Sequence, residues 1–192
     1  MHGPNDGAAE GRISGLAGLL AAAETGNPPV ESWDPPYCGD IGLSIRADGV
    51  WLYRGSPIER PALVKLFARV LRGDADGRYY LVTPTERVDV AVADAPFLAV
   101  EMERQGSGRA ARLIVRTNVD DVVAVGPEHP LRLALAGDGG LKPYVRVRGR
   151  LEALATRALA FELAELALAE ANRHGGPPGL WSDGAFFPLP AS

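Results

Sequence analysis

Arginines and hydroxyl groups gather where the expected strands and helices end, and such groups bind anions. Arg54 and Ser56 stand at the corner before an expected helix, and Arg60 follows in its first turn. A guanidinium group can form paired hydrogen bonds to phosphate, and the free N–H groups at a helix N-terminus attract anions. This corner could therefore hold the phosphate of a small ligand. In the alternative reading, Ser56 and Glu59 only cap the helix and Arg54 pairs with Glu59 or Glu86.

Further polar and aromatic residues at strand ends extend this candidate site. We predict that Arg54, Arg60 and Arg87 bind an anion and that Trp51 or Tyr144 stacks on a base. Each residue taken alone is also explained as a cap, an ion pair or a solvated sheet position, so a site requires that they converge. The candidate ligand-binding residues are Trp51, Arg54, Ser56, Arg60, Thr83, Glu86, Arg87, Asn118, Tyr144, Arg146 and Arg148.

Motifs for catalysis or for metal binding are missing from the sequence. It contains no phosphate-binding G-x-x-x-x-G-K-[ST], no G-x-S-x-G elbow and no H-E-x-x-H. His2, His129 and His174 are isolated from one another, so we expect neither a metal site nor a cofactor. Cys38 would be a nucleophile only beside a base, which makes an enzyme the weakest hypothesis.

The corner that carries Arg54 must be positioned by a hairpin and a helix. Asp48-Gly49 is a tight-turn dipeptide between strand-like runs at 42–46 and 50–53. Ser56-Pro57-Ile58-Glu59 reads as a capping box that starts the helix. Because Pro61 would then lie inside the helix, the alternative is a 3₁₀ turn over 56–59 with the regular helix beginning near Pro61.

The remaining chain has the alternating hydropathy of strands until a long helix begins. The segment from Arg150 to Arg173 is rich in Ala, Leu and Glu, which predicts one long helix. Its leucines spread over more than half the circumference, so we expect burial on two sides. The expected strands lie at 78–83, 87–92, 97–104, 110–117, 119–125, 131–136 and 144–148.

These elements predict an α+β protein made of two small β-rich units. The expected parts are a flexible N-terminus with a short helix (1–32), an N-terminal α+β unit (33–77), a C-terminal unit (78–174) and a tail (175–192). About seven strands capped by a C-terminal helix resemble the pleckstrin-homology-like pattern. The tail carries three aromatic residues, so it should fold back or dock on a neighbour. Similar stretches before the two helices, Trp51 to Gly55 and Val145 to Gly149, suggest a duplicated motif.

Composition places the chain among ordinary globular proteins. It is 46% hydrophobic and 23% charged, with a net charge of −4. This balance argues against binding to duplex nucleic acid. The single cysteine excludes an internal disulfide, and no apolar run approaches the ~20 residues of a membrane span. We therefore expect a cytoplasmic protein.

A series of short motifs resembles a known bacterial family. The motifs are W-x-P-P-x-C-G from Trp33, D-G-x-W-x-Y-x-G-S-P-I-x-R from Asp48, L-V-T-P-x-E-R from Leu81, D-A-P-F from Asp94, T-N at Thr117 and P-Y-x-x-V-R from Pro143. Together they resemble the uncharacterised proteins of the domain of unknown function DUF1285. Pro61 departs from the family pattern, and the glycine- and proline-rich tail is expected to be peculiar to this chain.

The resemblance implies two related β-rich units, the C-terminal one superficially pleckstrin-homology-like. It also implies a ligand pocket at their interface for a nucleotide-type molecule and a role in signal transduction, with no established activity. We therefore expect a protein that binds a phosphate-bearing small molecule, and that Arg87→Ala removes binding with little change in melting temperature. The alternative is a protein–protein adaptor that uses the last helix and the aromatic tail, through either of which it could form a homodimer.

Overall fold

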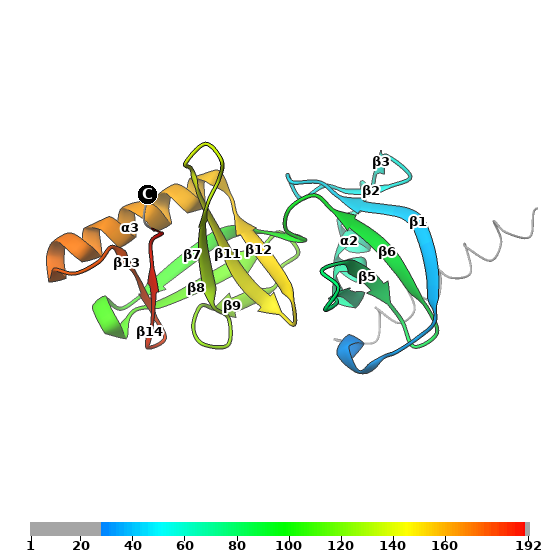
Figure 1. The fold of residues 1–192 in the computed structure, drawn as a ribbon, viewed down its shortest axis with the longest axis horizontal. Coiled ribbons are helices and arrows are strands. Elements are labelled where there is room, and N and C mark those ends of the chain that lie inside the picture. The colour runs from blue at the N-terminus through cyan, green and yellow to red at the C-terminus, as the bar shows by residue number, and fades with distance from the viewer. Residues whose placement is uncertain (1–27, 191–192) are drawn as a thin grey trace, which may run out of the picture. The chain divides into compact units, whose positions relative to one another are not determined.

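The chain forms two compact units that divide between Ala93 and Asp94. The computed structural model describes residues 28–190, so the short helix expected near Ile13 lies outside the described residues. Within that range the chain is mostly β-structure, with two α-helices and two curled six-stranded sheets (Figure 1).

The first unit is one mixed sheet, and a helix connects its first three strands to its last three along the chain. Its strand order is β3-β2-β1-β6-β5-β4, and the central pair β1 and β6 is parallel. The helix buries Phe67, Ala68 and Val70, and Trp51 stacks on Phe67. The elements are η1 (Val30–Ser32), β1 (Tyr37–Ile45), β2 (Trp51–Tyr53), β3 (Ser56–Pro57), α2 (Pro61–Val70), β4 (Leu71–Gly73), β5 (Tyr79–Val82) and β6 (Arg87–Val92).

The predicted capping box at Ser56 and the alternative 3₁₀ turn over 56–59 are both wrong, whereas the alternative start of the regular helix near Pro61 is confirmed. Arg54 and Gly55 both have positive φ, 49° and 81°, which is the geometry of a two-residue type I′ hairpin turn. That turn places Ser56 in β3, paired with Tyr53, instead of at a helix cap. Pro61 occupies the first helical turn, where its fixed φ suits the helix and its missing N–H costs nothing.

The second unit is a mixed sheet with a long helix and a terminal hairpin. Its strand order is β10-β11-β12-β7-β8-β9, with β12 and β7 as a parallel central pair. Helix α3 packs along β7, β11, β12 and β13 (Figure 1). The elements are β7 (Phe97–Gln105), η2 (Gly108–Ala110), β8 (Arg112–Thr117), β9 (Val122–Ala124), β10 (Leu131–Leu135), β11 (Leu141–Arg148), β12 (Leu151–Ala155), α3 (Arg157–His174), β13 (Gly179–Ser182) and β14 (Ala185–Pro188).

The segment predicted as the first part of the long helix is in fact strand β12. Leu151, Ala153 and Ala155 are buried while the residues between them are not, which is the period of a strand. The helix begins after Thr156, whose side chain accepts a hydrogen bond from the Leu159 N–H. The high helix propensity of Leu, Ala and Glu hid this boundary in the sequence.

The two sheets share one topology. In each, a first meander of three antiparallel strands (β1-β2-β3, or β7-β8-β9) is followed by a second (β4-β5-β6, or β10-β11-β12). The first strand of the first meander then pairs in parallel with the last strand of the second. The units differ in their helices, because α2 connects the two meanders of one unit whereas α3 follows the second meander of the other. This correspondence supports the expected duplication.

The stretches that suggested the duplication are not equivalent positions, however. Trp51 to Gly55 covers β2 and its turn, whereas Val145 to Gly149 covers β11 and its turn. In the shared topology β2 corresponds to β8, and β11 corresponds to β5. Both stretches lead into a strand and not directly into a helix.

The expected boundary after residue 77 and the count of seven C-terminal strands both change. Strands β5 and β6 complete the first sheet, because β6 pairs with β1 and β5 pairs with β4. With β12 added, the second sheet has six strands and a central parallel pair. The strand count on which the pleckstrin-homology likeness was based therefore does not hold.

The tail folds back onto its own unit, one of the two expected outcomes. Strands β13 and β14 form a hairpin, and Leu180 and Ser182 are buried. The Ser182 hydroxyl donates to the Val125 carbonyl (2.6 Å) and accepts from the Leu113 N–H (2.8 Å). The hairpin is thus held against β8 by polar as well as apolar contacts.

Candidate functional site

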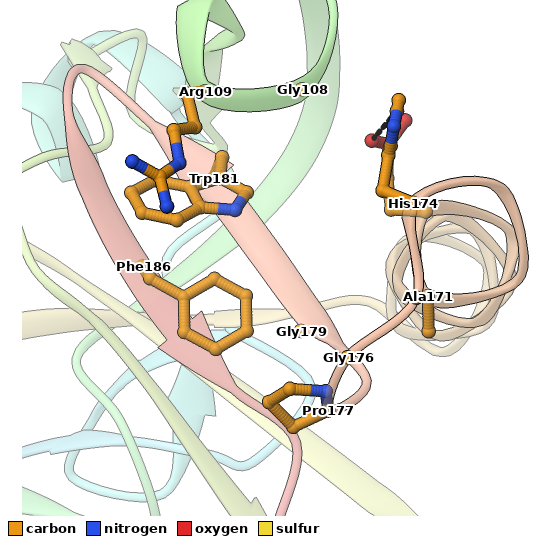
Figure 2. A pocket seen from close by; sticks show the side chains of 11 residues that line it. Gly108, Arg109, Ala171, His174, Gly176, Pro177, Gly179, Trp181 and Phe186 are labelled. Carbon is orange, nitrogen blue, oxygen red and sulfur yellow. Dashed lines mark ion pairs between the residues drawn. The ribbon is translucent and has the colours of Figure 1, made fainter.

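A cavity of about 480 Å³ lies in the second unit between the C-terminal end of α3, the hairpin β13–β14 and η2. Its walls combine two aromatic rings, charged side chains and several glycines (Figure 2). This volume is within the range of small-molecule sites. The lining residues are Gly108, Arg109, Glu170, Ala171, His174, Gly175, Gly176, Pro177, Gly179, Trp181 and Phe186.

The aromatic wall is positioned by the terminal hairpin. Trp181 and Phe186 are paired across β13 and β14, and their ring centroids are 5.1 Å apart. Gly179 permits this packing, because a Cβ at that position would lie 2.4 Å from Phe186 Cζ. Neither ring is fully buried, so part of each remains available to a ligand.

Arg109 adds a positive charge to this wall. Its guanidinium lies 5.0 Å from the centre of the Trp181 ring, as Figure 2 shows. The side chain is exposed and forms no ion pair with any residue in 28–190. An arginine held over an indole and lacking a carboxylate partner can accept an anionic group.

The opposite wall carries a buried acid. The Glu170 side chain is 8% exposed and pairs with Arg104 (2.6 Å), Arg173 (3.0 Å) and His174 (3.5 Å). Burial by itself raises the pKa of Glu170, but the hydrogen bond and charge of Arg104, with Arg173 and His174, outweigh it. The pKa of Glu170 therefore lies below its ordinary value, and the carboxylate is charged at neutral pH.

Three predicted site residues in the first unit are engaged within the protein. The Trp51 ring is 1% exposed and stacks on Phe67, so it offers no face to a ligand, and its predicted stacking role is corrected. The Thr83 hydroxyl closes the turn before β6 by accepting from the backbone N–H groups of Thr85 and Glu86. Arg87 lies over Tyr80 and pairs with Asp74 at 3.1 Å.

These contacts change what we expect of Arg87→Ala. Removing Arg87 also removes an ion pair and a cation–π contact, so the melting temperature should fall, contrary to the sequence-based expectation.

Arg54, Ser56 and Arg60 are exposed, and the Arg54 guanidinium lies 5.2 Å from the Tyr53 ring centre. Glu86 is partly exposed in its turn. Their role in binding stays a prediction.

The predicted residues of the second unit are mostly engaged as well. The Asn118 side chain accepts from the Leu98 N–H (2.9 Å), and Arg148 pairs with Asp121 (2.6 Å). The Tyr144 hydroxyl donates to Asp94 (2.8 Å), and Arg132 covers the Tyr144 ring at 4.0 Å.

Arg146 differs from these three because its side chain is exposed. None of the four, Asn118, Tyr144, Arg146 or Arg148, lines the cavity beside α3. Their predicted role in binding likewise stays a prediction.

Sequence reasoning did not select the residues that line the cavity. Two signals were present: the glycine-rich loop before Arg109 and the aromatic tail that contains Trp181 and Phe186. Glu170 and His174, four residues apart, also share a face of the last helix. What the sequence lacked was the contact between the tail and the end of α3.

The fold defines a protein of two duplicated mixed β-sheet units, the second of which carries its own cavity. The family model for the DUF1285 N-terminal domain, a domain of unknown function, matches residues 28–95, and the model for the DUF1285 C-terminal domain matches residues 96–189. The chain belongs to the DUF1285 family. Because the second model extends to residue 189, the tail is part of the family's domain, which corrects the expectation that it is peculiar to this chain.

Two solved structures are similar to the chain. A DUF1285 family protein from Silicibacter pomeroyi DSS-3 is 45% identical, with a TM-score of 0.80 over 90% of this chain and 94% of that one. A DUF1285 family protein from Shewanella baltica OS155 is 29% identical, with a TM-score of 0.51 over 65% of this chain and 91% of that one. A comparison with curated proteins gave no match.

Within residues 28–190, no group of three or more His, Cys, Asp or Glu residues is placed to hold a metal ion. No helix there is long and apolar enough to cross a membrane.

Proposed function

We propose that this protein binds a small aromatic anion, of the nucleotide type, in the cavity beside the end of α3. The observation that carries the proposal is Arg109, which lies over Trp181 at the cavity wall and has no carboxylate partner among the described residues. A cytoplasmic sensory or signalling role would follow if binding changes how the protein interacts with others.

The chemistry of the wall fits such a ligand. The exposed parts of Trp181 and Phe186 can stack on a planar ring, which contributes about 1–3 kcal/mol per base where it has been tested by substitution. The Arg109 fork can bind phosphate oxygens through paired hydrogen bonds. A ring and an anion are thus recognised by neighbouring groups, which is the basis for proposing one ligand that contains both.

Titration calorimetry with adenosine 5′-monophosphate tests this proposal. We expect saturable binding to the wild type and affinity weaker by about tenfold or more in Arg109→Ala, since hydrogen bonds to charged groups contribute about 1.5–3 kcal/mol. Trp181→Ala should weaken binding similarly. Arg112→Ala is the matched control, because Arg112 is also exposed but does not line the cavity, and its affinity should stay within about twofold.

Two results would overturn the proposal. One is the absence of saturable binding by the wild type to nucleoside monophosphates or aryl phosphates. The other is binding by Arg109→Ala that equals the wild type. The anion-binding role of Arg54 and Arg60 is a separate prediction, which the double variant Arg54→Ala/Arg60→Ala would reveal under the same conditions.

A second candidate is self-association through α3. Phe161 and Leu168 are 65% and 51% exposed, so two large apolar side chains of one helix face solvent. They are seven residues apart and so lie on the same face, two turns from each other. The tail is a poorer candidate for this role, because Leu180 and Ser182 are buried within the unit.

A further inference from the structure

Glu170 is an acid in an unfavourable position, which indicates a role beyond the fold. It lies in the last turns of α3, where the helix dipole disfavours negative charge. It is also buried, which disfavours a charge again. Arg104, Arg173 and His174 offset both effects, and Glu170 also lines the cavity.

The two carboxylate oxygens are used unequally. Oε1 accepts hydrogen bonds from Arg104 Nη2 (2.6 Å) and Arg173 Nη1 (3.0 Å). Oε2 is buried and accepts no hydrogen bond from any described residue. His174 Nε2 lies 3.5 Å from Oε2. A buried carboxylate oxygen without a donor is rare enough to need an explanation.

Glu170 on α3 and the aromatic residues of the β13–β14 hairpin line the same cavity. Figure 2 shows Arg109, Trp181 and Phe186 on the hairpin side, and His174 with its ion pair on the helix side. His174 is 62% exposed at the end of the helix, so its side chain can rotate away from Oε2. Such a rotation would expose Oε2 to a ligand stacked on Trp181.

We infer that the ligand of this cavity carries an N–H donor that binds Glu170 Oε2, which makes it an amino-substituted heteroaromatic anion. This inference rests on the proposed function and deepens it. The anionic group would bind at Arg109, the ring at Trp181, and the amino group at Glu170. An analogue with the same ring and phosphate but without the amino group would leave Oε2 unpaired.

Two nucleotides that differ by one amino group provide the test. Adenosine 5′-monophosphate has a 6-amino group, and purine riboside 5′-monophosphate has hydrogen at that position. We expect the wild type to bind the amino compound at least about tenfold more tightly, the preference typical of one hydrogen bond to a charged group.

Glu170→Gln assigns that preference to the carboxylate. The two arginines will hold the amide oxygen at the Oε1 position, which puts the NH₂ group at the position of Oε2. A donor facing the ligand's amino group should abolish the preference. Glu165→Gln is the matched control, since Glu165 is exposed on the same helix and does not line the cavity. His174→Ala should keep the preference.

Each outcome has a distinct meaning. Equal binding of the two nucleotides by the wild type, or an unchanged preference in a folded Glu170→Gln, overturns the inference and leaves the proposed function intact. If neither nucleotide binds, both fail. If Glu170→Gln does not fold, the comparison of the two nucleotides on the wild type still decides whether an N–H donor is recognised.

Discussion

The polar residues of the family motifs mostly close turns and strand ends. Thr83 and Thr117 are buried, and each hydroxyl accepts backbone N–H groups of the turn that follows. Asn118 pairs with the backbone of Leu98 through both its side chain and its own N–H. A polar residue at a strand end is therefore as consistent with turn closure as with a ligand site.

Asp94 offers a test of this structural role at a single residue. It accepts hydrogen bonds from Lys142 and Tyr144, both on β11. Burial raises the pKa of Asp94, but the two hydrogen bonds and the charge of Lys142 outweigh this effect, so the pKa lies below its ordinary value. A pKa that is depressed in the folded state stabilises the protein above the unfolded pKa, and this stability is lost as pH falls through the folded value.

We therefore expect Asp94→Asn to lower the free energy of unfolding by about 1–2 kcal/mol at pH 5–7. The difference from the wild type should shrink as pH falls through the depressed pKa of folded Asp94, where the wild-type carboxylate also becomes neutral. Urea denaturation and hydrogen exchange in β11 measure both effects. Glu162→Gln is the control, because Glu162 is exposed. A difference that is independent of pH would contradict the assigned charge.

Residue types were easier to predict than their partners. The sequence shows that Arg87 follows a turn, but its ion pair with Asp74 and its place over Tyr80 depend on the register of three strands. In the same way, the sequence could not reveal that Trp51 is a core residue packed on Phe67. Contacts between residues far apart in sequence leave no local signal.

At the scale of elements, local hydropathy predicts strands well and fails where propensity competes with it. Strand β6, in which Val88, Val90 and Val92 alternate with other residues, was predicted with its observed bounds, and β10 and β7 were predicted within one residue at one end. Strand β12 was missed because Leu, Ala and Glu favour helices. Tertiary pairing with β7 and β11 overrides that preference.

Helix α3 has one buried face and one exposed apolar patch formed by Phe161 and Leu168. Leu159, Leu163 and Ala167 pack within the unit. Phe161 and Leu168 do not, so we expect them to form the contact in a dimer. Phe161→Glu combined with Leu168→Glu should convert a dimer to a monomer without loss of fold, as measured by light scattering and circular dichroism.

Glu162→Lys is the control for that experiment, because it changes an exposed charge on the same helix and leaves the apolar patch intact. The dimer should survive this control. A wild type that is monomeric at every concentration tested would exclude this self-association, and the exposed patch would then need another explanation.

At the scale of the whole molecule, the duplicated topology explains where the chain can be divided. Each six-stranded sheet is complete only when the last strand of its second meander pairs with the first strand of its first meander. Parallel pairing between strands that are distant in sequence has no local pattern, which is why the sequence suggested a boundary near residue 77. Neither sheet contains a strand from the other unit.

We predict that residues 28–93 and residues 94–192 each fold as separate fragments, since each contains a complete sheet and its own helix. Cooperative thermal unfolding and dispersed amide signals in nuclear magnetic resonance would show this. Residues 33–77 should remain unfolded, because that fragment lacks β6, the central partner of β1.

The fragment 94–174, which lacks the tail, tests whether the tail is needed for the stability of the second unit. It keeps the second sheet but loses the buried residues Leu180 and Ser182, so the Leu113 N–H on β8 loses its acceptor. We expect it to be less stable than 94–192 by several kcal/mol, since a buried N–H without a partner costs about 1–3 kcal/mol and a buried leucine contributes about 2–5. Equal melting temperatures for the two fragments would mean that the hairpin is an accessory of the unit. A lower value for 94–174 would show that the hairpin, which also forms the aromatic wall of the cavity, stabilises the unit.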